Sequence, residues 1–204
     1  MPDQTDFVLR FLLFAGAHSL FAASRVKALF SRSGKGEPRL YRLAYNIASL
    51  AAFGWVMAAF RNAPVLYELN RVVRWMMHSG QLATAATLLF CVSQTGGGDF
   101  LGIDQLRPSA PRVPHLVTTG CYARVRHPLY LLSMLFLLLS PVMTVSWALL
   151  TIMSFVYFIA GGMIEERRLL EQFGDEYRSY RKRVPFMIPA NFMAAGPSRR
   201  SAEE

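Results

Sequence analysis

Charged side chains are scarce in this sequence, and cysteine is nearly missing. Only 17% of the 204 residues are charged and 53% are hydrophobic, in long blocks, which excludes an ordinary soluble domain and favours a polytopic membrane protein. Cys91 and Cys121 lack metal-ligand spacing, so neither a zinc site nor a disulfide framework is expected. We expect Cys91 to be a small buried residue. The glycines at 96–98 are not followed by a helix-opening pattern, which excludes a dinucleotide-binding fingerprint.

The longest stretch without a charge, residues 129–164, organises the rest of the chain. As one helix its 36 residues would be about 54 Å long, well beyond a hydrocarbon core of about 30 Å. Ser140 and Pro141 fall near its middle, and proline breaks a helix. We therefore predict a hairpin of two membrane helices that turns between Ser140 and Trp147 and returns the chain to the face it left.

The positive charges are unevenly distributed. Further apolar blocks cover residues 7–24, 43–60 and 75–93, which together with the hairpin makes five spans. With this count, eighteen of the 22 Lys and Arg residues lie on one face. The positive-inside rule assigns that face to the cytoplasm and explains the net charge of +9 without nucleic acid. We predict an all-α polytopic membrane bundle, expected in a bacterial inner membrane with its C-terminus in the cytoplasm.

One domain is expected over residues 1–204. Residues 1–94 hold three spans, 95–190 hold a connector, the hairpin and a C-terminal helix, and 191–204 form a tail, which is expected to be disordered from Ala194 to Glu204. The acidic start lacks the basic region of a cleavable signal, so the first span is expected to be an uncleaved anchor. After Glu165 the chain is predicted to continue as an amphipathic helix whose apolar face is formed by Leu169, Phe173, Tyr177, Tyr180 and Val184.

The hairpin brings two groups of polar residues to one membrane surface. They are Arg124, Arg126, His127 and Tyr130 before it, and Glu165 and Glu166 after it. Each has a plain explanation: the acids mark the membrane boundary, the arginines anchor to phosphates, and His127 and Pro128 start a helix. Together they favour a ligand with a cationic centre, a carboxylate and a flat ring, which describes S-adenosylmethionine.

Five segments in order carry a resemblance to a known family. They are Leu116-Val-Thr-Thr-Gly-Cys-Tyr122, Arg126-His-Pro-Leu-Tyr130, Glu165-Glu166, Phe173-Gly-Asp-Glu-Tyr-Arg-Ser-Tyr180 and Arg183-Val-Pro185. The chain from Leu116 to Pro189 resembles the membrane methyltransferases that include isoprenylcysteine carboxyl methyltransferases and phospholipid N-methyltransferases. The N-terminal half, with Ala17-His-Ser19 and Tyr41-Arg-Leu-Ala-Tyr-Asn46, is similar to NnrU-type proteins and bacterial thiol methyltransferases of that superfamily.

The resemblance implies a cofactor, S-adenosylmethionine, and roles for named residues. Cofactor-binding positions would be Leu116, Val117, Tyr122, His127, Pro128, Leu129, Tyr130 and Glu165. Arg126 and Glu166 would shape the reacting end and are the catalytic candidates. The implied fold is a small bundle of membrane helices that holds the cofactor on the cytoplasmic side, under the C-terminal helix. No metal, nucleic acid or protein partner is implied.

The sequence departs from the family at two positions. Cys121 stands where many relatives have proline. Gly161 stands where prenylcysteine enzymes carry an arginine assigned to the substrate carboxylate, so a prenylcysteine acceptor lacks its expected partner here. A lipophilic acceptor of the isoprenylcysteine type, a thiol and a lipid headgroup all stay open as methyl acceptors.

Two hypotheses in which the protein is not an enzyme also remain open. His18 lies in the first span and His78 at the start of the third, and histidines in membrane helices can bind haem or serve a quinone site. Their depths match poorly, and for His18 we expect a hydrogen bond to a neighbouring helix instead. A scaffold that keeps the fold without activity is the other reading, and the intact motif argues against it.

Overall fold

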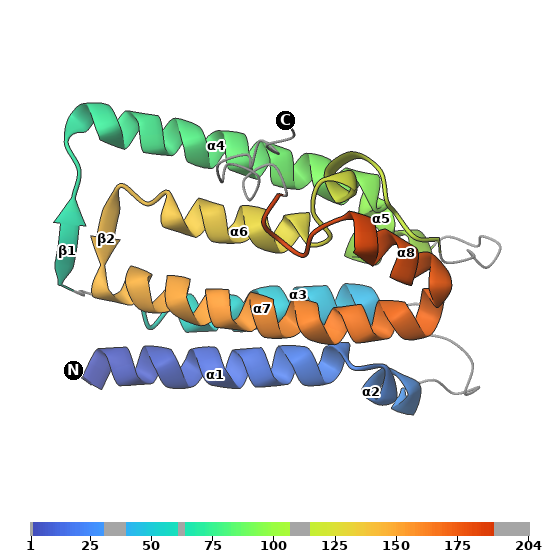
Figure 1. Cartoon of the computed structure of the whole chain (residues 1–204). Coiled ribbons are helices and arrows are strands. Elements are labelled where there is room, and N and C mark those ends of the chain that lie inside the picture. Colours follow the sequence, from blue (N-terminus) through green and yellow to red (C-terminus); the bar gives the residue numbers. More distant parts are fainter. Residues whose placement is uncertain (1, 31–39, 61–63, 107–114, 190–204) are drawn as a thin grey trace, which may run out of the picture.

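The computed structural model describes residues 2–30, 40–60, 64–106 and 115–189, and these are largely helical (Figure 1). The N-terminal elements are α1 (Pro2–Ala22), α2 (Ser24–Leu29), α3 (Tyr41–Met57), the strand β1 (Val65–Glu68) and α4 (Arg71–Gln94). The connector forms α5 (Gly97–Leu101) and the 3₁₀ turns η1 (Asp104–Leu106) and η2 (Gly120–Ala123). The rest is α6 (Pro128–Leu138), the strand β2 (Val142–Thr144), α7 (Val145–Phe173) and α8 (Asp175–Arg183).

The outer surface of the helices is apolar. Two helices, over Gln4–Ala22 and Val145–Phe173, are long and apolar enough to cross a membrane, and only 11% and 17% of their apolar windows are buried inside the protein. Large exposed side chains include Leu13, Leu50, Leu82, Ile152 and Val156. A core helix of a soluble protein would bury such residues. This surface is that of a membrane protein.

The charge-free stretch folds as the predicted pair of helices. Pro128 occupies the first turn of α6, where its missing N–H leaves no hydrogen bond unmade. The turn lies between α6 and α7, and Thr144 caps α7 by accepting from the Trp147 N–H at 3.1 Å. With 11 residues, α6 is about 16 Å long, which is shorter than a full membrane span.

A short antiparallel sheet joins the two loops at the end of the bundle opposite the α7–α8 junction (Figure 1). β1 pairs with β2, with Val65 opposite Thr144 and Glu68 opposite Val142. The Tyr67 hydroxyl adds a hydrogen bond to the Ser140 carbonyl at 3.2 Å. The expectation of helices alone is wrong here, because each strand is too short to show an alternating pattern within an apolar chain.

The helices pack in two groups that share α7. α4 lies along α6, while α1 packs against α3 and α7 (Figure 1). A buried cluster of Phe7, Phe11, Val56, Ala59 and Leu150 holds α1, α3 and α7 together near the sheet end. At the opposite end the connector, η2, the mouth of the hairpin and α8 gather, and this end carries the charged residues predicted to form the site.

The C-terminal helix is interrupted. The predicted continuous helix after Glu165 instead ends at Phe173 and restarts at Asp175, because Gly174 has a φ of +54°, a conformation that favours glycine. Tyr177 and Tyr180 of α8 are buried, as expected for its apolar face. Residues 31–38, between the first two apolar blocks, and the tail from residue 191 lie outside the described residues.

The two cysteines are bonded to each other, contrary to the sequence-based expectation. Cys91 is fully buried in the last turns of α4, and its sulfur forms a disulfide with Cys121 of η2. The Gln94 side chain adds a second tie, since its Oε1 accepts from the Cys121 N–H at 2.9 Å. A spacing of 30 residues matches no motif, and the pairing depends on the fold that brings η2 against α4.

Candidate active site at the mouth of the helix hairpin

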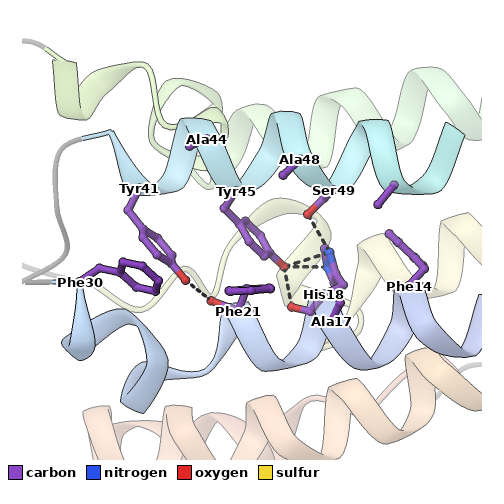
Figure 2. A pocket seen from close by; sticks show the side chains of 11 residues that line it. Phe14, Ala17, His18, Phe21, Phe30, Tyr41, Ala44, Tyr45, Ala48 and Ser49 are labelled. Atoms are coloured by element: carbon purple, nitrogen blue, oxygen red, sulfur yellow. Dashed lines mark hydrogen bonds between the residues drawn. The ribbon is translucent and has the colours of Figure 1, made fainter. Parts of the chain in front are cut away.

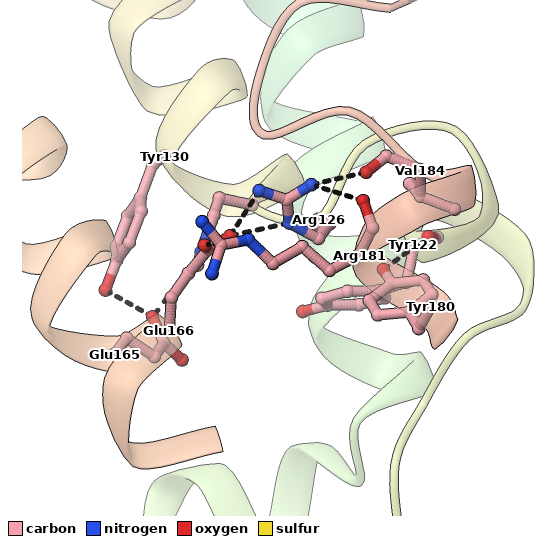
Figure 3. Close-up of polar contacts among 9 residues, drawn as sticks. Tyr122, Arg126, Tyr130, Glu165, Glu166, Tyr180, Arg181 and Val184 are labelled. Carbon is pink, nitrogen blue, oxygen red and sulfur yellow. Dashed lines mark hydrogen bonds and ion pairs between the residues drawn. The ribbon is translucent and has the colours of Figure 1, made fainter. Parts of the chain in front are cut away.

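A buried ion pair joins the two arms of the hairpin (Figure 3). The Arg126 Nε donates to Glu166 Oε1 at 2.5 Å, and each side chain is only 8% exposed. Glu166 also pairs through Oε2 with Arg181 of α8 at 3.3 Å. The second arm of the Arg126 guanidinium donates to the carbonyls of Val184 and Arg181. Glu166 therefore holds α7, α8 and the segment before α6 in one arrangement.

The main chain supports the same arrangement. The Arg126 N–H donates to the Pro185 carbonyl at 2.9 Å, and the His127 N–H donates to the Phe186 carbonyl at 3.1 Å. The segment that follows α8 thus runs beside the segment that leads into α6. Gly162 makes room for it, because a Cβ at that position would lie 2.8 Å from the Phe186 ring.

Glu165, next to the buried Glu166, has a different environment. Its side chain is 46% exposed, and its Oε2 accepts from the Tyr130 hydroxyl at 2.9 Å. His127 Nδ1 lies 3.6 Å from the same oxygen. Because nearly half of the Glu165 side chain is exposed, part of its carboxylate faces outward. Of the two adjacent acids, Glu166 is enclosed by arginines and Glu165 is accessible to a ligand.

His127 is the buried centre of the site. It is 5% exposed, stacks on Tyr130 with 5.5 Å between ring centroids, and meets the edge of Phe186 at 4.7 Å. Its Nε2 lies 3.5 Å from Glu166 Oε1 and makes no hydrogen bond. The ring therefore lies between the two acids, with Nδ1 toward Glu165 and Nε2 toward Glu166.

Two tyrosines on the α8 side remain protonated far above neutral pH. The Tyr180 hydroxyl donates to the Tyr122 carbonyl at 2.6 Å. Burial, with the nearby charge of Glu165, raises the pKa of Tyr122 to about 12. Burial, with the nearby Glu166 charge and despite Arg126, raises the pKa of Tyr180 to about 12. Both phenols are therefore hydrogen-bond donors under ordinary conditions.

The structure brings together most of the predicted site residues. Arg126, His127, Tyr130, Glu165 and Glu166 meet through direct contacts. Pro128 is buried, and Leu129, Leu116, Val117 and Tyr122 are half-buried; Leu116 and Val117 lie in a stretch without regular structure before η2. Their predicted roles toward a cofactor stay predictions. Gly161 faces this group as well, since a Cβ there would lie 4.0 Å from the Tyr130 hydroxyl.

Sequence reasoning assigned no role to three residues that complete the site: Arg181, Tyr180 and Phe186. All three lie within or directly after the segments Phe173–Tyr180 and Arg183–Pro185, which carry the family resemblance. The sequence therefore pointed to this region but not to the contacts of these three side chains. The contacts depend on the break at Gly174, which turns α8 back over the hairpin. Within the described residues no group of three His, Cys, Asp or Glu side chains is placed to hold a metal ion.

Comparison with known proteins identifies the family. The family described as "NnrU protein" matches residues 6–188. The chain belongs to the NnrU family. The match covers both halves of the chain, including the part that resembles membrane methyltransferases.

Curated relatives carry methyltransferase names. Methanethiol S-methyltransferase of Pseudomonas deceptionensis is 35% identical over 43% of this chain and 34% of its own length. The Mycobacterium tuberculosis protein of that name is 27% identical over 87% of this chain and 74% of its own length. Human protein-S-isoprenylcysteine O-methyltransferase is 30% identical over 73% of this chain and 52% of its own length. The chain thus spans about a third of the first of these relatives. No solved structure matches.

Proposed function

We propose that this protein is an S-adenosylmethionine-dependent methyltransferase of the membrane. The observation that carries the proposal is an accessible carboxylate, Glu165, beside the buried His127, whose Nδ1 lies 3.6 Å from Glu165 Oε2, with the Arg126–Glu166 ion pair behind them. The names of the relatives, which describe S- and O-methyltransferases, support the reaction class. S-adenosylmethionine supplies an electrophilic methyl group on a cationic sulfur.

The residues present suit such a molecule. Glu165 offers a carboxylate that can accept from the ribose hydroxyls or the ammonium group. The rings of Tyr122 and Tyr130 offer flat faces to an adenine or a sulfonium. Arg126 and Glu166 hold these groups in place from behind, so we assign them to positioning and to shaping the reacting end.

The methyl acceptor that fits best is a thiol. Position 161 faces the Tyr130 hydroxyl but is glycine, so it supplies no cation for an acceptor carboxylate. A thiol needs no such partner: its proton would pass to His127, the candidate base, and its sulfur would take the methyl group as the methyl–sulfonium bond breaks and leaves S-adenosylhomocysteine, a transfer that depends mainly on positioning and exclusion of water. Several relatives are named for methanethiol as substrate.

A lipophilic acceptor is the second candidate, and a specific groove favours it. A depression of about 340 Å³ lies between α6, α7 and the segment after α8, and is lined by Leu131, Met134, Leu135, Leu138, Phe155, Ile159, Pro185, Phe186, Met187 and Ile188. Phe186 borders both this groove and His127. An apolar tail in the groove would therefore end beside the polar site.

We further propose five membrane spans, formed by α1, α3, α4, α6 together with the residues up to β2, and α7, with the site and the C-terminus in the cytoplasm of a bacterium. Eighteen of the 22 Lys and Arg residues lie on that face with this topology. α8 would then cover the site at the membrane surface, with Tyr177 and Tyr180 turned inward and its charged residues outward.

Calorimetric titration of S-adenosylmethionine and S-adenosylhomocysteine into the detergent-purified protein tests the cofactor. We expect saturable binding of both. Glu165→Gln should weaken binding by about 10- to 100-fold, the loss of a hydrogen bond to a charged group. Glu171→Gln, an exposed acid on the same helix, is the matched control and should leave binding unchanged. Equal affinity in Glu165→Gln and the parent protein would refute the proposed site.

Turnover with two acceptors separates the candidates. Methanethiol and N-acetyl-farnesylcysteine are each supplied with S-adenosylmethionine, and the thioether or methyl ester is measured. We expect the thioether to form and the ester to stay at background. Ester formation would establish the lipophilic acceptor instead, and cofactor binding without either product would exclude both.

A further inference from the structure

A second cavity lies apart from the hairpin site, between α1 and α3 (Figure 2). It has a volume of about 440 Å³, within the range of small-molecule sites. Five aromatic rings line it, from Phe14, Phe21, Phe30, Tyr41 and Tyr45. The rest of the lining is Ala17, His18, Ala44, Ala48, Ser49 and Ala52. None of these residues belongs to α6, α7 or α8.

The sequence builds this cavity with small residues. Ala44, Ala48 and Ala52 recur at four-residue spacing, which puts them on one face of α3, and all three line the cavity. Larger side chains at these positions would let α1 and α3 close by interdigitation, as they do near the sheet end around Phe11 and Val56.

A polar group sits on one wall of this otherwise apolar space. His18 Nδ1 lies 2.9 Å from the Ser49 hydroxyl, and His18 Nε2 lies 2.8 Å from the Tyr45 hydroxyl. The expected hydrogen bond from His18 to a neighbouring helix is thus present. The Tyr45 hydroxyl also lies 3.2 Å from the His18 carbonyl, a group inside α1.

We propose that this cavity binds the ring of a membrane-dissolved quinone. Aromatic side chains stack on a flat ring, and a quinone carbonyl requires a hydrogen-bond donor in apolar surroundings. With the His18 proton on Nε2, the Tyr45 oxygen accepts it and the Tyr45 O–H is left to donate. The Tyr45 O–H now points to the His18 carbonyl, which already accepts a backbone N–H within α1. If the O–H turned to a ligand carbonyl instead, the His18 carbonyl would still have its hydrogen bond.

The location matches a ligand that arrives through the lipid. Ala44 and Ala48 line the cavity and are exposed, as is the apolar Ile47 next to them in α3. His18 lies one turn from the end of α1, so the polar wall is near the membrane surface and the cavity extends along the span. The open side thus faces acyl chains, and the polar wall fixes the head of the ligand.

Haem, the other ligand that a membrane histidine suggests, does not fit a pair of histidines here. The second candidate, His78, belongs to α4, which lies on the far side of the bundle from α1 (Figure 1). Its Nδ1 contacts Gln81 of the same helix at 3.0 Å. His18 has both ring nitrogens within hydrogen-bond distance of neighbouring hydroxyls.

The test is binding of 2,3-dimethyl-1,4-naphthoquinone, a fully substituted ring that does not react with thiols. The full-length protein is reconstituted in lipid nanodiscs, and bound quinone is measured by equilibrium dialysis against empty nanodiscs. We expect one saturable site per chain above the partition background. Tyr45→Phe should weaken it by about 3- to 10-fold, the value of one hydrogen bond. Ala48→Trp, which fills the cavity, should abolish it.

Two controls keep the outcome specific. Tyr130→Phe, which removes a hydroxyl from the hairpin site, should leave quinone binding unchanged. Binding of S-adenosylhomocysteine by Ala48→Trp reports that this variant is folded and keeps the two proposals separate. Unaltered quinone binding in Ala48→Trp, or partition equal to that of empty nanodiscs, would overturn the inference. So would a Soret band that copurifies with the protein and disappears in His18→Phe.

Discussion

Arg126 and Glu166 form an ion pair that is closed off from solvent on both sides, with 2.5 Å between Nε and Oε1. The pair connects the segment before α6 to the last turns of α7, two segments that are 40 residues apart. A buried charge that loses its partner is costly, whereas an exposed ion pair contributes little. The chain contains both kinds, which allows a matched comparison.

We predict that Arg126→Gln strongly destabilises the protein. Glu166 would lose its buried arginine and keep the more exposed Arg181 and the His127 ring as neighbours, and the carbonyls of Val184 and Arg181 would lose their donor. The expected cost is about 3–5 kcal/mol, measured as a lower thermal unfolding midpoint in detergent. Arg178→Gln breaks the exposed pair with Asp175 and should cost less than about 1 kcal/mol. Equal shifts in both variants would show that Arg126 is not structurally special.

The adjacent glycines of α7 give a second matched pair. A methyl group at Gly162 would lie 2.8 Å from the Phe186 ring, while one at Gly161 meets only the Tyr130 hydroxyl, at 4.0 Å. Gly162→Ala should displace the segment after α8 and cost about 1–3 kcal/mol, the usual price of overpacking. Gly161→Ala should be neutral or slightly stabilising, because alanine is the better helix former. Thermal unfolding of both variants tests this prediction. A larger loss of stability in Gly161→Ala than in Gly162→Ala would contradict it.

Much of this arrangement could be predicted from the sequence, because some of the contacts between distant residues follow from local sequence features. The charge-free stretch with Pro141 near its middle predicted a helix pair, and the pair then placed Arg126 and Glu166 on one surface. Those inferences needed only hydrophobic length and the geometry of a hairpin. The family resemblance added the candidate roles of residues such as Tyr122.

Other contacts could not be predicted from any local feature of the sequence. The Cys91–Cys121 bond depends on η2 packing against α4, which no spacing encodes. The site contact of Arg181 depends on the positive φ at Gly174. A glycine in the sequence does not predict such a break, because glycine is also frequent inside membrane helices. The short pairing of β1 with β2 has too few residues for a period of two to appear. In each case the determinant is a tertiary contact, so a single sequence read locally does not contain it.

The disulfide leads to a prediction about topology. η2 belongs to the face that we assign to the cytoplasm, where thiols are kept reduced. We therefore expect both Cys91 and Cys121 to be labelled when cells are quenched with acid and the denatured protein is alkylated, and the bond to form in purified protein without reductant. Cys91→Ser with Cys121→Ser should then unfold at the temperature of the reduced protein. A bond already present in the acid-quenched cells would place this face outside the cytoplasm.

Tyr180 leads to a prediction about alkaline pH. Its hydroxyl donates to the Tyr122 carbonyl at 2.6 Å, and its pKa is raised to about 12 from an ordinary value near 10. An acid whose folded pKa is raised contributes stability that is complete below the unfolded pKa, here about 10, and is lost as the pH rises through about 12. Tyr180→Phe should cost about 0.5–1.5 kcal/mol at pH 8 through the lost hydrogen bond. It should also flatten the fall in unfolding midpoint between about pH 10 and pH 11, compared with the parent protein. A parallel fall in both proteins would mean that Tyr180 ionises as freely in the folded state as in the unfolded state.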